Sequence, residues 1–150
     1  MKRHYFMKTT TLLTIWCLFI STQILWSQQI ETDYLEAISM ARNQQKGLIY
    51  LFVDQSMDST QTKDFTLNFL DSDAFKALSV RYVVLQVNCS SSGGVESSDA
   101  LYCKRLTSVY NKERKFPAVL ATDIKLQPEG GLQTDFSTTA INTYINSLKQ

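Results

Sequence analysis

The chain has 150 residues, of which 44% are hydrophobic and 19% are charged, and it contains only two prolines. This composition favours one compact domain and excludes a disordered chain. The formal net charge is +1 with no basic patch in the sequence, so we expect no nucleic-acid partner.

Residues 1–27 differ in composition from the rest of the chain. Three basic residues fall within the first eight positions, and the stretch Leu12–Trp26 is uncharged and mostly apolar. This order is typical of a secretory signal peptide, with Ser27 as the small residue before the cleavage point. An uncleaved N-terminal anchor is the alternative, because the uncharged stretch is only slightly shorter than a membrane span. We expect export to the periplasm or the extracellular space, with membrane contact only if the segment is retained.

Cleavage would leave residues 28–150 as the folded domain, without His4, which is the one histidine of the chain. That domain keeps 12 of the 15 basic residues and all 14 acidic residues, a net charge of −2. Without histidine it cannot use a Ser-His-Asp triad or a histidine metal site. Cys89 and Cys103 remain, and in an exported chain such a pair is most simply a disulfide. Two free, buried thiols are the alternative if the chain is not exported.

The first two elements are a helix and a strand. Thr32–Lys46 has apolar residues at helical spacing, which predicts a helix with Thr32 or Asp33 as its N-cap and Gly47 as its stop. Leu48–Val53 is a short apolar run rich in β-formers. It indicates a strand that is covered on both faces.

A second helix is expected from about Ser59, after a polar corner. Asp71-Ser72-Asp73 should end this helix and cap a short one at Ala74–Leu78. Tyr82–Val87 is the second clear strand, and the polar stretch Asn88–Ser98 that follows it indicates a long loop.

Asp99 can cap a third long helix, which runs to about Tyr110. Asn111–Lys115 is a charged connection, and Phe116–Thr122 is a third strand with a proline near its start. The pattern therefore continues to alternate between helix and strand.

The chain is expected to close with a hairpin and a helix. Pro128-Glu129-Gly130-Gly131 predicts a hairpin turn into a strand at Leu132–Phe136, and Thr138 or Thr139 then opens the last helix. Alternating helices and strands require parallel strands with crossover helices, and the hairpin adds an antiparallel edge. The predicted fold class is α/β, with one mixed sheet between helices.

Four segments of the chain, taken in order, resemble the thioredoxin-like superfamily, in its exported branch that begins with a helix. They are QQKG before LIYLF, then FLDSDAF, YVVLQVN, and FPAVLATD with its PEGG hairpin. Together they span roughly residues 32–149. The resemblance implies a three-layer α/β/α sandwich with a mixed central sheet.

In that family a Trp-Cys-x-x-Cys motif follows the first long strand, and its first cysteine is a reactive thiolate at a helix N-terminus. Counting back from FLDSDAF puts the two cysteine positions at Ser59 and Thr62. Counting forward from LIYLF puts them at Asp58 and Gln61. Neither register has a cysteine, and a hydroxyl cannot replace a thiol in disulfide exchange. Leu51 stands where active relatives have a buried, proton-moving aspartate, so the resemblance implies the fold without this chemistry.

Pro117 matches the family's proline opposite the motif, which is usually cis. In the family, the backbone of the preceding residue, here Phe116, pairs with an extended peptide. An ordinary trans proline at the start of a strand is the alternative. The resemblance implies that Phe116, Pro117, Met57 and Asp58 contact a protein or an extended peptide.

Three functions remain open at this point. The first is a non-catalytic binding or structural module, and the second is a thiol–disulfide oxidoreductase or redox accessory protein that uses Cys89 and Cys103. The third is a stress- or envelope-associated protein without a ligand. A reduction potential near those of known oxidoreductases would favour the second. Asp54, Asp58 and Asp64 lie close in sequence but fit no recognised cation-binding loop. We expect no metal and no cofactor.

Overall fold

The computed structural model describes residues 29–54, 57–90 and 98–148 of the chain. The signal-peptide prediction, Gln55, Ser56 and most of the 88–98 loop lie outside these ranges.

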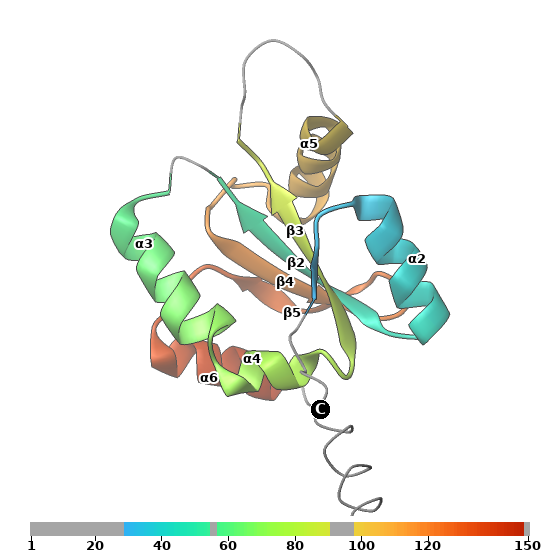
Figure 1. Ribbon diagram of the computed structural model, residues 1–150. Helices are drawn as coiled ribbons and strands as arrows, with labels where there is room; N and C mark the ends of the chain where they lie inside the picture. Colours follow the sequence, from blue (N-terminus) through green and yellow to red (C-terminus); the bar gives the residue numbers. More distant parts are fainter. Residues whose placement is uncertain (1–28, 55–56, 91–97, 149–150) are drawn as a thin grey trace, which may run out of the picture.

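Within the described residues, five strands form one sheet in the order β1-β3-β2-β4-β5 (Figure 1). The strands are β1 Ile30–Glu31, β2 Gly47–Val53, β3 Tyr82–Asn88, β4 Ala118–Thr122 and β5 Pro128–Gln133. The helices are α2 Tyr34–Gln44, α3 Ser59–Asp64, the π-helix η1 Phe65–Leu70, α4 Asp73–Leu78, α5 Ser98–Tyr110 and α6 Thr138–Ser147.

The sheet is mixed, as the sequence predicts. β1 and β2 both run parallel to β3, whereas β4 is antiparallel to both β2 and β5. Alternation of helices and strands predicts parallel pairing, which holds up to β3. β4 departs from it, because the chain comes back from α5 in the opposite direction.

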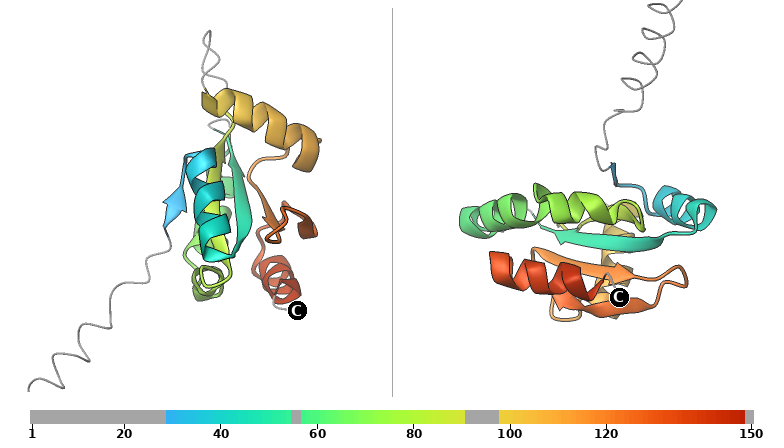
Figure 2. Two further views of the ribbon diagram at one scale, coloured as in Figure 1. Left: turned by 90° about the vertical axis from the view of Figure 1, so that its right-hand side faces the viewer. Right: turned by 90° about the horizontal axis from the view of Figure 1, so that it is seen from below.

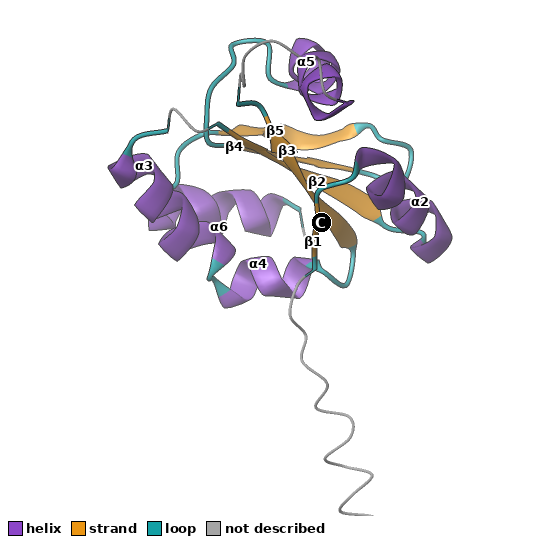
Figure 3. Cartoon of the chain, turned by 45° about the horizontal axis from the view of Figure 1, so that its top comes forward, coloured by secondary structure: helices purple, strands orange, loops and turns teal. Residues whose placement is uncertain are grey.

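Helices cover both faces of the sheet, which makes three layers (Figure 3). Ile49 and Leu51 of β2 join the core under η1, α4 and α6, whereas Leu48, Tyr50 and Phe52 join the core under α2 and α5. This alternation is the period of two that a strand imposes on its side chains. α6 packs beside β5 (Figure 2). The three-layer α/β/α sandwich and the doubly covered β2 are thus confirmed.

The second helix changes its hydrogen-bonding pattern halfway along. It is α-helical over Ser59–Asp64 and a π-helix over Phe65–Leu70. Phe65 and Phe69 point into the core and their ring centroids lie 6.0 Å apart. Ser72 then caps α4, accepting a hydrogen bond from the Phe75 amide at 3.1 Å. The predicted break at Asp71-Ser72-Asp73 is confirmed, but nothing in the sequence pattern indicates the π-helix.

The sequence predicts that Gly47 stops the first helix, but the helix ends before it. Helix α2 ends at Gln44, and Gln45 closes it in a left-handed conformation with φ 53°. Gly47 instead begins β2 and donates a hydrogen bond to the Arg81 carbonyl at 2.9 Å. At the other end of α2, Asp33 is the N-cap, which decides between the two predicted caps.

The predicted hairpin turn at Pro128-Glu129-Gly130-Gly131 is wrong, because these residues belong to β5. The turn lies earlier, where Asp123 accepts hydrogen bonds from the amides of Lys125 and Gln127, each at 2.8 Å. An aspartate that bonds to the backbone two residues ahead is an efficient turn former. Pro128 is tolerated in β5 because an edge strand need not donate every amide.

Two further observations concern the ends of the domain. The last helix opens at Thr138, one of the two predicted residues, and Ser137 before it is the N-cap, accepting from the Ala140 amide at 3.4 Å. The strand β1 was not anticipated, and it pairs with Val84 and Leu85 of β3. Two residues are too few to show a period in the sequence.

Candidate functional site

The corner after β2 is organised by Asp58, which is the N-cap of α3. Its carboxylate accepts a hydrogen bond from the Gln61 amide at 2.7 Å, and its carbonyl accepts one from the Thr62 hydroxyl at 2.8 Å. These bonds satisfy polar groups of the first helical turn. Ser59 and Gln61 are exposed, and Met57 is half-buried. Both predicted motif registers thus lie on a capped, solvent-facing helical turn.

The strand register brings Phe116 and Pro117 to this corner. Ala118 of β4 pairs with Phe52 of β2 in antiparallel register. The two residues before Ala118 therefore lie beside the end of β2, where the chain turns towards Met57. The Phe116–Pro117 peptide bond is cis, as the resemblance implies. Pro117 is buried and Phe116 is half-buried.

Leu51 lies beneath the corner and is 1% exposed. It belongs to the apolar core that includes Phe65 and Val119. An aliphatic side chain in this place cannot take or release a proton, and the described residues put no cysteine on the corner itself. The corner therefore lacks both the nucleophile and the buried acid of a thiol-exchange site.

Buried tyrosines supply the perturbed titratable groups of the core. Burial raises the pKa of the Tyr50 and Tyr144 hydroxyls well above the ordinary value. Tyr144 accepts a hydrogen bond from the Ala121 amide at 2.9 Å, and Tyr110 donates to the Leu126 carbonyl at 3.1 Å. These hydroxyls stay protonated at neutral pH, and those of Tyr144 and Tyr110 brace the backbone of β4 and of the following turn.

Cys89 and Cys103 form a disulfide, which confirms the predicted pairing. Cys89 directly follows β3 and its amide donates to the Val53 carbonyl at 2.8 Å, so it lies at the same end of the sheet as the corner. Cys103 lies on α5, and the two Cα atoms are 5.4 Å apart. The two residues are only 6% and 4% exposed, respectively. The bond therefore fixes α5 against the carboxyl end of β3.

A pocket of about 210 Å³ opens beside this disulfide. Both cysteines line it, together with Leu101, Lys104 and Arg114. Lys104 and Arg114 were not among the residues predicted for the site. They are ten positions apart in the sequence, and only the packing of α5 against the connection to β4 brings them to one pocket.

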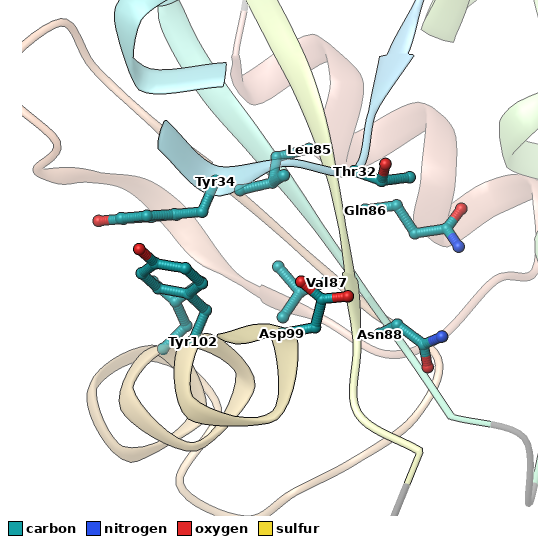
Figure 4. Close-up of a pocket in the computed structure, with 9 residues that line it drawn as sticks. Thr32, Tyr34, Leu85, Gln86, Val87, Asn88, Asp99 and Tyr102 are labelled. Atoms are coloured by element: carbon teal, nitrogen blue, oxygen red, sulfur yellow. The ribbon is translucent and has the colours of Figure 1, made fainter. Parts of the chain in front are cut away.

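A smaller pocket of about 110 Å³ lies between α2, α5 and the carboxyl half of β3 (Figure 4). Tyr34 and Tyr102 form one wall, with ring centroids 4.7 Å apart. Asp99 and Asn88 lie on the opposite side. This pocket contains none of the residues predicted for the site.

A third pocket, of about 340 Å³, lies at the other end of the sheet. Lys46, Arg81, Tyr82 and Glu129 line it, and the Tyr82 hydroxyl donates a hydrogen bond to Glu129. Gly47, at the amino end of β2, also lines it. It is therefore separate from the corner, which follows the carboxyl end of the same strand.

No cluster of metal-ligating side chains occurs among the residues that the structure describes. Asp54, Asp58 and Asp64, which lie close in sequence, do not form one. In the same ranges, no helix has both the length and the apolar character that crossing a bilayer requires.

The fold has clear counterparts among solved structures. The chain is similar to the DsbH oxidoreductase, with a TM-score of 0.61 and 18% identity over 81% of this chain and 84% of that one. It is similar to a thioredoxin from Thermus thermophilus, with a TM-score of 0.62 and 12% identity over 82% and 88%. A disulphide isomerase from Xylella fastidiosa Temecula1 gives a TM-score of 0.54 and 12% identity over 77% and 88%. No protein-family model and no curated protein sequence matches the chain.

Proposed function

The chain has a thioredoxin-like fold, and we propose that it acts as an exported binding or structural module that holds an extended peptide without exchanging thiols. The similar structures are named as an oxidoreductase and a disulphide isomerase. The proposal departs from those names because the corner of this chain has hydroxyl, carboxyl and amide side chains in place of cysteines. The exposed corner and the adjoining Phe116 would form the contact surface.

The observation that carries the proposal is the register between β2 and β4. It brings the backbone of Phe116 and Pro117 beside the corner, which would let one ligand contact that backbone, the half-buried Met57 and the first turn of α3. Surfaces of this kind bind extended peptides through backbone hydrogen bonds and a few side-chain pockets. A module of this kind would need no nucleophile.

Export rests on the composition of residues 1–27 and is consistent with the disulfide, since disulfides persist in oxidising compartments. Export is tested by expressing the chain in a bacterium and measuring the mass of the protein recovered from the periplasm. Cleavage after Ser27 gives a chain that begins at Gln28. A cell fraction that contains only the uncleaved, membrane-bound chain would contradict it.

Peptide binding is tested with an acetylated, amidated peptide of alternating threonine and valine, added to ¹⁵N-labelled protein. We expect the largest amide shifts at residues 57–62 and 116–118. Met57→Ala should weaken binding roughly fivefold, because a partly buried apolar contact at the centre of the surface is lost.

Leu67→Ala is the matched control, because Leu67 is 54% exposed and lies on the π-helix away from the corner. It should leave the affinity unchanged. Shifts confined to the other end of the sheet, around Lys46 and Asp123, would contradict a peptide site at the corner. So would equal weakening by both substitutions.

A second function, disulfide exchange through Cys89 and Cys103, is favoured by one observation, namely that both cysteines line the 210 Å³ pocket. Their burial opposes it, because a thiolate must reach the sulfur that it attacks. We expect the oxidised and the reduced protein to be no more active in insulin reduction than the Cys103→Ser variant. Robust turnover that disappears in this variant would establish the oxidoreductase instead.

A further inference from the structure

Two cations face the pocket beside the disulfide without a counter-ion from the described residues. Lys104 projects from α5, and Arg114 belongs to the connection between α5 and β4. Neither forms an ion pair within the described ranges. None of the described residues that line the pocket carries a carboxylate. The nearby Asp99 lines the pocket on the tyrosine side of α5 instead.

The backbone of Arg114 is held in an unusual conformation. Its φ is 52°, in the left-handed region that non-glycine residues seldom adopt. Such a residue persists where its surroundings over-determine it, often at a functional site. The position of this arginine is therefore fixed at the expense of local stability.

Asn111 is what fixes this conformation. It is fully buried, and its side chain donates to the Lys115 carbonyl at 2.8 Å and accepts from the Lys115 amide at 3.0 Å. Its carbonyl accepts from the Arg114 amide at 2.9 Å. A buried amide with these bonds rigidifies the loop around it. The loop therefore presents Arg114 to the pocket in a set backbone geometry.

The carboxylate of the same loop is already used. Glu113 pairs with Lys115 at 2.7 Å and not with Arg114. The charge of Arg114 is thus left to act together with that of Lys104. Leu101, which is 38% exposed, and the buried disulfide add apolar surface to the pocket. This combination suits a carboxylate attached to a short apolar body.

We propose that this pocket binds a carboxylate of the peptide that occupies the corner, which makes the partner an acidic extended peptide. The inference rests on the proposed peptide-binding function. Arg114 is two residues before Phe116, and the Cys89 amide is hydrogen-bonded to the Val53 carbonyl at the end of β2. The pocket and the corner therefore belong to one end of the sheet. Arginine binds a carboxylate through two parallel hydrogen bonds, and lysine adds a point charge.

The first experiment examines the pocket alone, with benzoate and its neutral analogue benzamide as probes of ¹⁵N-labelled protein. Benzoate should shift the amides of residues 101–104 and 114, and benzamide should shift them far less. Lys104→Gln and Arg114→Gln should each weaken benzoate binding roughly fivefold, which is the upper range for a solvent-exposed ion pair. Lys112→Gln is the matched control, because Lys112 is an exposed cation of the same loop that does not line the pocket.

Equal shifts from benzoate and benzamide, or equal losses in all three variants, would overturn the proposal. The second experiment compares two threonine-valine peptides, one ending in glutamate and one in glutamine. The glutamate peptide should bind roughly fivefold more tightly, with the difference lost in Arg114→Gln. If both peptides bind equally at the corner, the peptide-binding function stands and the acidic preference is wrong. If neither peptide binds while benzoate does, the peptide-binding function fails and the acidic-peptide proposal fails with it.

Discussion

Replacement of both Cys89 and Cys103 by alanine is expected to lower the free energy of unfolding by about 3 kcal/mol. The disulfide joins residues 14 positions apart, so it restricts a loop of moderate length in the unfolded chain. Truncation of two buried side chains adds a cavity cost, which stays small because alanine still fills part of the space. Urea denaturation followed by circular dichroism measures the change.

The reductant provides the control for this prediction. Dithiothreitol should destabilise the natural protein by a similar amount and leave the double-alanine variant unaffected, since only the natural protein has a bond to break. If the reductant shifts neither midpoint, Cys89 and Cys103 are not joined in solution. A much larger loss in the alanine variant than on reduction would show that the sulfur atoms act mainly through packing.

The sheet could be predicted from the sequence because its central strands are long and almost wholly buried. All but the last residue of β2 are buried, and β3 is similar, so apolar runs identify both. β1 could not be found, since two residues carry no pattern and its pairing with Val84 is decided by the fold. The hairpin was misplaced because two glycines suggested a turn, whereas the hydrogen bonds of Asp123 made one earlier.

The candidate site divides in the same way. The corner at Asp58 could be located by counting from recognisable segments, and Asp58 is a helix cap that local sequence can indicate. The pocket with Lys104 and Arg114 could not be located. It depends on how α5 packs and on a left-handed residue that no motif marks. The sequence carries one signal for this loop, namely Asn111, an uncharged amide in an otherwise charged connection, which the structure shows to be buried.

Gly47→Ala should be at least as damaging as loss of the disulfide, lowering the free energy of unfolding by about 3 kcal/mol or more. A Cβ at Gly47 would lie 2.1 Å from the carbonyl oxygen of Thr122 and 2.9 Å from the ring of Tyr82. Neither neighbour can retreat easily. Thr122 is a backbone contact in the adjacent strand, and Tyr82 is held by its bond to Glu129 and by Arg81 over its ring.

Gly131→Ala is the matched control, because Gly131 also lies in a strand but a Cβ there meets nothing within 4 Å. Both substitutions restrict the unfolded chain to the same extent, which by itself stabilises a protein by about 0.4–1 kcal/mol. The difference between the two midpoints in urea therefore isolates the clash at Gly47 from the entropy of losing a glycine. Equal stabilities of the two variants would mean that β2 and β4 can separate at this point without cost. The close approach of their backbones would then not explain the glycine at the start of β2.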